Sequence, residues 1–122
     1  MPLILVIDDD DQVRGMLREM LGRAGYEVAD APNGKEGIRL YRQNPADLVI
    51  TEIIMPEKEG IETIMDLRRE FPGVKIIAMS GGGSIGPEEY LYMARRLGAN
   101  RTFAKPLERD ELLKAVGELI GI

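Results

Sequence analysis

The chain has 122 residues, of which 44% are apolar and 30% are charged, and its formal charge at pH 7 is −5. These values are ordinary for a globular chain with a single core, so we expect one domain over residues 1–122. The sequence has no Cys and no His, which excludes disulfides, thiol nucleophiles, zinc–thiolate sites and a histidine general base. A bound metal would need carboxylate and carbonyl oxygens, which suit Mg²⁺ or another divalent cation.

The charge balance also bears on partners. An acidic chain without a basic cluster is a poor direct binder of nucleic acid. The apolar run Leu3–Ile7 is too short for a signal peptide or a membrane span. We therefore expect a cytoplasmic protein that binds neither nucleic acid nor membrane directly.

The first part of the chain alternates apolar runs with helical patterns. Leu3–Ile7 predicts a first strand, which stops at four successive aspartates, residues 8–11. One of these aspartates can cap a helix, whose apolar residues recur at helical spacing: Val13, Met16, Leu17, Met20 and Leu21. Tyr26–Ala31 predicts a second strand, and Asn33 is a plausible cap for a second helix that ends near Gln43.

The third unit contains the most informative stretch. The run Leu48–Ile50 is apolar and largely β-branched, which is typical of a strand buried on both faces. It ends in Glu52, and Pro56 and Gly60 then turn the chain out of the sheet. A third helix is expected from about Ile61 to Glu70, with four residues facing inward: Ile61, Ile64, Met65 and Leu67.

The last part of the chain repeats the alternation twice. We expect a strand, a helix, a strand and a helix over Val74–Met79, Pro87–Leu97, Arg101–Ala104 and Glu108–Ile120. A glycine-rich loop, residues 81–84, precedes the first of these helices. Five strand–helix units in alternation predict an α/β fold, in which a doubly wound parallel sheet is covered by helices on both faces.

Polar side chains follow four of the predicted strands. Asp8 and Asp9 follow the first, Glu52 the third, Ser80 the fourth and Lys105 the fifth. In a parallel sheet these residues lie at one edge, where open α/β sheets bind ligands. Converging carboxylates would repel one another unless a divalent cation or the Lys105 ammonium relieved the charge. Ser80 and Lys105 are suited to holding an oxyanion, such as a phosphoryl group on a neighbouring carboxylate.

Each of these residues also has an ordinary structural interpretation. An Asp run before a helix is usually a cap, a Ser before glycines is usually part of a loop, and a Lys before Pro is usually solvated. A Glu at a strand end usually marks the exit from the sheet. The combination at the ends of four strands is what favours a functional site.

Taken together, these motifs resemble the receiver (phosphoacceptor) domain of two-component response regulators, over essentially the whole chain. Asp8 and Asp9 match the acidic pair of the family, and Pro56 and Gly60 match its turn. Ser80 matches the switch hydroxyl. Lys105, which precedes Pro106, matches the lysine that contacts the phosphoryl group. The resemblance implies a flavodoxin-like (βα)5 sheet with strand order 2-1-3-4-5, a role in phosphorelay signal transduction rather than an enzyme, and a cis Lys105–Pro106 bond.

The resemblance also implies a cofactor and partners. Mg²⁺ would be held by Asp9, Glu52 and the backbone carbonyl of Ile54, while Asp8 acts mainly through water. A sensor histidine kinase or phosphotransfer protein would supply the phosphoryl group, and an output domain or partner protein would read the result. A homodimer is possible through the fourth helix, fifth strand and fifth helix, a region that includes Tyr90, Tyr92, Arg95, Arg96 and Arg101. The alternative for this face is a solvated charged surface.

Two positions depart from the family pattern. The phosphoaccepting Asp falls on Glu52, which is longer by one CH₂, roughly 1.5 Å. Glu52 is explained either by a naturally divergent receiver that is not phosphorylated or by a deliberate Asp-to-Glu change made to imitate or block phosphorylation. The active-like neighbours favour the second explanation. Thr102 lies where the family often has a Tyr or Phe switch, and Phe103 should face the other side of its strand.

Two other functions fit parts of the pattern. A phosphatase of the haloacid dehalogenase type would use Asp8 as nucleophile and Asp10 as acid, but the chain lacks a substrate-capping insertion. A flavodoxin-like nucleotide binder would use the loop over residues 81–84, but the chain has no Trp to stack on a flavin and no dinucleotide fingerprint.

Overall fold

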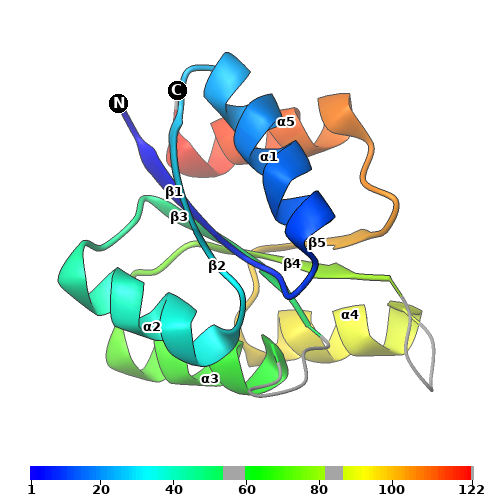
Figure 1. Cartoon of the computed structure of the whole chain (residues 1–122). Coiled ribbons are helices and arrows are strands. Elements are labelled where there is room, and N and C mark those ends of the chain that lie inside the picture. The colour runs from blue at the N-terminus through cyan, green and yellow to red at the C-terminus, as the bar shows by residue number, and fades with distance from the viewer. Residues whose placement is uncertain (54–59, 82–86, 122) are drawn as a thin grey trace.

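A single parallel sheet forms the centre of the molecule in the computed structural model, which describes residues 1–53, 60–81 and 87–121 (Figure 1). The strands lie in the order β2-β1-β3-β4-β5, as the resemblance implied. Their bounds are Leu3–Ile7 (β1), Glu27–Ala31 (β2), Leu48–Glu52 (β3), Ile76–Ser80 (β4) and Arg101–Ala104 (β5). The predicted α/β doubly wound fold is therefore confirmed.

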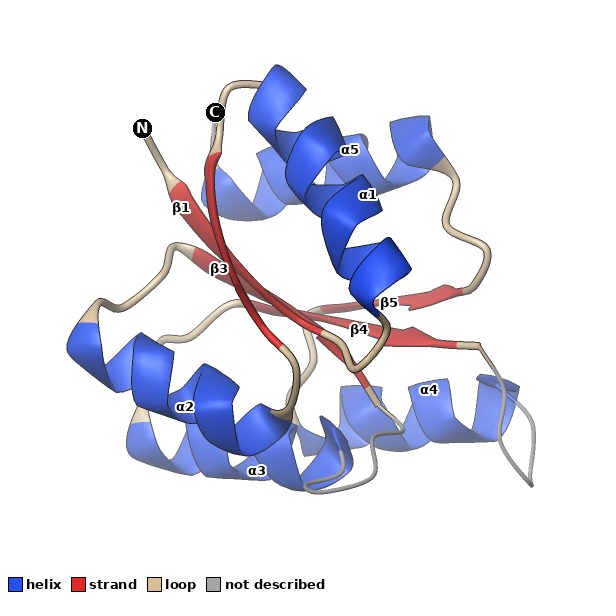
Figure 2. Ribbon diagram, in the orientation of Figure 1, coloured by secondary structure: helices blue, strands red, loops and turns tan. Residues whose placement is uncertain are grey.

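The helices cover both faces of this sheet (Figure 2). Their bounds are Asp11–Arg23 (α1), Gly34–Gln43 (α2), Gly60–Glu70 (α3), Pro87–Leu97 (α4) and Arg109–Ile120 (α5). One apolar layer packs α1 and α5 on the sheet through Leu17, Leu21, Leu112 and Val116. The other packs α2, α3 and α4 through Ile38, Tyr41, Ile64, Leu67 and Ala94. None of the helices in the described part of the chain is long and apolar enough to cross a membrane.

The register of the strands decides which residues share an edge. Ile7 pairs with Thr51, Glu52 with Met79, and Ser80 with Ala104. The residues that follow these pairs therefore leave the sheet on the same side, at the carboxyl ends of the strands. This edge is where the sequence places its polar residues.

Helix caps explain two of the helix starts. The side chain of Asp10 accepts a hydrogen bond of 2.8 Å from the backbone N–H of Gln12, so Asp10 is the aspartate that caps α1. The side chain of Asn33 accepts one of 2.8 Å from the backbone N–H of Glu36, as expected for the cap of α2. Ordinary capping thus accounts for Asp10, while Asp8 and Asp9 precede the helix.

Several sequence predictions about packing and boundaries were wrong, and β2 begins at Glu27 rather than at the predicted Tyr26. The fourth strand begins at Ile76, not Val74, because the N–H of Val74 donates to the carbonyl of Phe71 and closes the turn after α3. Met65 was expected to face inward, and Met16 belongs to the helical apolar pattern of α1, yet each residue is 43% exposed. Their helices carry an apolar stripe wider than the surface that packs on the sheet. The predicted ligand Ile54 and most of the glycine-rich loop lie outside the described residues.

Candidate functional site

Lys105 joins the ends of three strands. Its Nζ lies 2.9 Å from Oδ2 of Asp8 and 2.5 Å from Oε2 of Glu52. Asp8 is fully buried and Glu52 is only 4% exposed, whereas the Lys105 side chain is 22% exposed. One ammonium group thus compensates two buried carboxylates that follow β1 and end β3, and it extends from the residue after β5.

The charge of Lys105 is stabilised by this environment. Burial opposes the ammonium form, but the hydrogen bonds to Glu52 and Asp8, together with their negative charges, outweigh it and raise the pKa of Lys105. Lys105 is therefore charged at neutral pH. It can attract a carboxylate or an oxyanion, but it cannot act as a base there.

The backbone around Glu52 is closely packed. Thr51 donates its hydroxyl to the carbonyl of Glu52 at 3.0 Å, and the N–H of Gly60 donates to the carbonyl of Ile53 at 2.6 Å. A Cβ added at Gly60 would lie 2.0 Å from the carbonyl oxygen of Glu52 and 2.4 Å from Cα of Ile53. Because both neighbours are backbone atoms, only glycine fits here. This explains why the predicted turn ends in Gly60.

Ser80 and Lys105 are held together by the backbone. The N–H of Lys105 donates to the carbonyl of Ser80 at 2.9 Å, and Ser80 is fully buried. The Lys105–Pro106 peptide bond is cis, as the resemblance implied. The structure thus brings Asp8, Glu52, Ser80 and Lys105 to one sheet edge, as the order of strand ends predicted.

Asp9 occupies a different environment from Asp8. Asp9 is exposed, while Oδ1 of Asp8 accepts a hydrogen bond of 2.9 Å from the N–H of Asp10. Within residues 1–53, 60–81 and 87–121, no three acidic side chains are grouped closely enough to hold a metal ion. The oxygen donors of Asp8, Asp9 and Glu52 nevertheless suit Mg²⁺ chemically. Lys105 lies against two of these three donors, so the ammonium would share them with a bound cation.

The fifth strand matches the expected placement of its side chains. Phe103 packs against the apolar layer under α1 and α5, and strand alternation places Thr102 on the opposite face. Thr102 is partly exposed. The position at which the resemblance implied an aromatic switch therefore carries a small hydroxyl side chain, on the face opposite Phe103.

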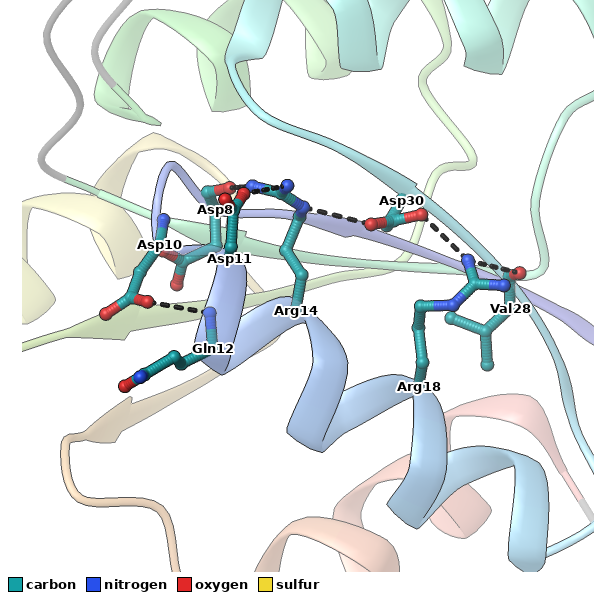
Figure 3. Close-up of polar contacts among 8 residues, drawn as sticks. All are labelled: Asp8, Asp10, Asp11, Gln12, Arg14, Arg18, Val28 and Asp30. Atoms are coloured by element: carbon teal, nitrogen blue, oxygen red, sulfur yellow. Dashed lines mark hydrogen bonds and ion pairs between the residues drawn. The ribbon is translucent and has the colours of Figure 1, made fainter.

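A second polar cluster was not predicted from the sequence (Figure 3). Arg14 on α1 donates to the carbonyl of Asp8 at 2.8 Å, to Oδ2 of Asp30 on β2 at 2.9 Å, and to the side chain of Asp11. Arg18, one turn along, donates to Oδ1 of Asp30 at 2.7 Å. The i, i+3 spacing of Asp11 and Arg14 is the one signal in the sequence from which their contact could have been inferred. The approach of Asp30 depends on how α1 crosses β2.

The comparisons with known proteins agree with this geometry. Residues 4–117 match the model of the response regulator receiver domain. The chain is 33% identical to the chemotaxis protein CheY of Halobacterium salinarum, over 96% of this chain and 95% of that protein. Among solved structures, a response regulator receiver domain protein from Clostridium thermocellum superposes with a TM-score of 0.90 at 28% identity, covering 99% of this chain and 95% of that one.

A further solved structure is similar in sequence as well as fold. The response regulator TrrA of Thermotoga maritima, in complex with Mg²⁺ and BeF, is 32% identical, covers 98% of this chain and 99% of its own, and superposes with a TM-score of 0.87. These matches favour the receiver interpretation over the phosphatase and nucleotide-binding alternatives. The chain belongs to the response regulator receiver domain family, the signalling domains of two-component phosphorelays.

Proposed function

We propose that this receiver domain uses the contact between Glu52 and Lys105 in place of a phosphoryl group, and that it accepts little phosphoryl itself. The observation that carries the proposal is the 2.5 Å separation between Oε2 of Glu52 and Nζ of Lys105 in a buried site. A phosphoryl group on a shorter side chain at position 52 would present its oxygens to the same ammonium. Glu52 thus imitates part of the phosphorylated state.

Transfer chemistry gives the physical reason for poor acceptance. The attacking oxygen must lie in line with the leaving group while positive groups hold the equatorial oxygens of the phosphoryl. The extra CH₂ of Glu52 moves its carboxylate by roughly 1.5 Å, into the volume where those oxygens would lie. A misplacement of about 1 Å can lower a rate about a hundredfold. Lys105 would have to release Glu52 before it could hold a donor phosphoryl group.

A divalent cation completes the proposed site. Asp8, Asp9, Glu52 and the carbonyl of Ile54 would hold Mg²⁺, with Asp8 acting mainly through water. The bound cation would neutralise charge on the transferring phosphoryl oxygens. The related TrrA structure contains Mg²⁺ together with BeF, which supports the proposal that this domain also binds a divalent cation. The oxygen-only donor set of this chain is consistent with that assignment.

The partners follow from the same assignment. A sensor histidine kinase or phosphotransfer protein would meet the site in a form with Asp at position 52. An output domain or partner protein would bind the face formed by α4, β5 and α5, which could also form a homodimer. On that face Tyr92 is 63% exposed and Arg96 lies over its ring, while Arg101 pairs with Glu118 of α5 at 3.8 Å. The domain is expected in the cytoplasm.

Acetyl phosphate tests the proposal directly. The chain and its Glu52→Asp variant are treated with acetyl phosphate and Mg²⁺, and the phosphoryl adduct is followed by mass spectrometry. We expect the Glu52→Asp variant to be labelled about a hundredfold faster, the factor that a misplacement of about 1 Å can produce. Glu52→Gln, which lacks a carboxylate, is the control for labelling elsewhere. An adduct on Glu52 that forms as fast as on the Asp variant would overturn the proposal.

A further inference from the structure

Arg14 connects the acidic turn to the edge strand of the sheet. Its Nε donates to Asp30, its Nη1 to the carbonyl of Asp8, and its Nη2 to Asp11 (Figure 3). The side chain is only 15% exposed, so these contacts are shielded from water more than those of a surface arginine. A planar guanidinium fixes the relative positions of groups that it binds through several nitrogens at once. The three acceptors come from the turn, from β2 and from the first turn of α1.

Both backbone polar groups of Asp8, its N–H and its carbonyl, make hydrogen bonds. Its N–H donates to the carbonyl of Ala31 at 3.1 Å, and its carbonyl accepts from Arg14, which is anchored on the neighbouring Asp30. Both contacts therefore fix the backbone of Asp8 relative to the end of β2. The carbonyl of Asp8 belongs to the same rigid peptide plane as the N–H of Asp9. Fixing that plane fixes the direction in which the chain presents Asp9.

We propose that Arg14 is a positioning residue for the cation-binding turn, and that it raises the affinity of the turn for a divalent cation by holding the Asp8–Asp9 peptide. This inference rests on the cation site proposed above. Arg14 touches the backbone of Asp8, whereas Lys105 touches its carboxylate. Residues that orient metal ligands typically contribute ten- to a hundredfold to metal affinity.

Simple electrostatics predicts the opposite sign. Arg14 is a cation close to an acidic turn, so its removal should reduce repulsion and strengthen the binding of a second cation. Loss of positioning should instead weaken binding, because Asp9 would sample orientations that do not face the site. The direction of the change therefore distinguishes the two roles.

Arg18 is a matched control. It binds the same Asp30 at 2.7 Å from the same helix, but its other contact is the carbonyl of Val28 at 3.4 Å. Its side chain is 50% exposed. Removing Arg18 deletes a positive charge and an Asp30 contact without touching the Asp8–Asp9 peptide.

The test is a Mg²⁺ titration of the whole chain, followed by NMR through the backbone amides of residues 8–12. We expect Arg14→Gln to weaken the affinity about tenfold or more, and Arg18→Gln to leave it unchanged or slightly stronger. Arg14→Lys keeps the charge but replaces the planar guanidinium, whose separate nitrogens bind Asp30 and the Asp8 carbonyl, by a single flexible ammonium, so it should also weaken binding. The amides of the central strands, recorded without Mg²⁺, establish that each variant is folded.

The outcomes separate this inference from the proposed function. Equal or tighter Mg²⁺ binding by Arg14→Gln and Arg14→Lys would overturn the positioning role while leaving the cation site in place. Failure of the unaltered chain to bind Mg²⁺ at all would overturn the cation site and the inference with it. Equal weakening by Arg14→Gln and Arg18→Gln would show that the contact with Asp30, and not the hold on the Asp8 carbonyl, is what matters, and would also overturn it.

Discussion

Asp8 belongs to two ionic clusters that differ in burial and in charge balance. Its carboxylate joins Glu52 and Lys105 in a largely buried cluster, which we call the edge cluster. Its carbonyl is bound by the frame cluster, which consists of Arg14, Arg18, Asp11 and Asp30 (Figure 3). The edge cluster has two carboxylates and one ammonium, a net charge of −1, whereas the frame cluster has two of each sign and a net charge of zero.

This difference in burial and net charge gives the clusters different roles: the edge cluster is suited to binding an ion, and the frame cluster is suited to supporting the backbone. Buried negative charge in excess is unfavourable, so the edge cluster gains stability from any further positive group that reaches it. A balanced and partly exposed cluster gains little from an added ion, and it can hold the chain in one geometry instead. The two clusters meet at Asp8, so the support acts on the backbone of a residue whose side chain belongs to the site.

The largest expected effect comes from removing the ammonium of the edge cluster. In Lys105→Met, two buried carboxylates lose the cation that compensates them, so we expect the free energy of unfolding to fall by about 3–5 kcal/mol at pH 7 without divalent cations. Chemical denaturation in the presence of EDTA measures the change. Adding Glu52→Gln to the same chain should recover part of the loss, because one of the repelling charges is then gone.

A lysine on the surface provides the matched control for this prediction. Lys114 is exposed on α5, and Lys114→Met should change the free energy of unfolding by about 0.5 kcal/mol or less. If Lys105→Met were no more destabilising than Lys114→Met, the edge cluster would not depend on its ammonium. The contrast between the two clusters would then fail.

Strand order made the edge cluster predictable from the sequence. Once the chain was recognised as five strand–helix units, Asp8, Glu52, Ser80 and Lys105 had to follow strands that end at the same edge. Which of the carboxylates Lys105 would contact could not be predicted, because that depends on side-chain conformation at the ends of three strands. The exposure of Asp9 depends on side-chain conformation in the same way, and the sequence carried no expectation for it.

Only part of the frame cluster could be predicted from sequence patterns. Helical spacing relates Arg14 to Asp11 and to Arg18, but it carries no information about a neighbouring strand. The contact with Asp30 requires the crossing of α1 over β2, which is set by packing of the apolar layer beneath α1. The same packing leaves Met16 exposed, although its spacing matches that of the buried Leu17 and Leu21.

A smaller effect is expected within the frame cluster. Arg14 and Asp30 are mostly shielded, with 15% and 27% of their side chains exposed, so a double-mutant cycle of Arg14→Gln and Asp30→Asn should give a coupling energy of about 1 kcal/mol. Arg18 is 50% exposed, and its coupling to Asp30 should be clearly smaller. Equal coupling energies from the two cycles would mean that the lower solvent exposure of Arg14 does not strengthen its contact with Asp30. Arg14 and Arg18 would then contribute equally to holding Asp30.

The smallest effect concerns pH, which should act on one cluster only. Lys105 can lose its proton at alkaline pH, whereas an arginine in the frame cluster stays charged. The carboxylates raise the pKa of Lys105 above the ordinary lysine value. Its stabilising contribution is therefore complete below that ordinary value, about 10.4, and is lost only as the pH rises through the higher folded value.

The stability of the edge cluster should thus be constant from neutral to mildly alkaline pH. An NMR titration of the Lys105 side chain in EDTA should show a pKa above the ordinary value. The same titration in Glu52→Gln should give a lower pKa, because the hydrogen bond to Glu52 is the largest of the effects that raise the pKa and the charge of Glu52 adds to it. A pKa below the ordinary value in the unaltered chain would mean that burial outweighs both carboxylates. The edge cluster would then disfavour the ammonium form of Lys105 on balance, and the predicted dependence of that cluster on the ammonium would fail.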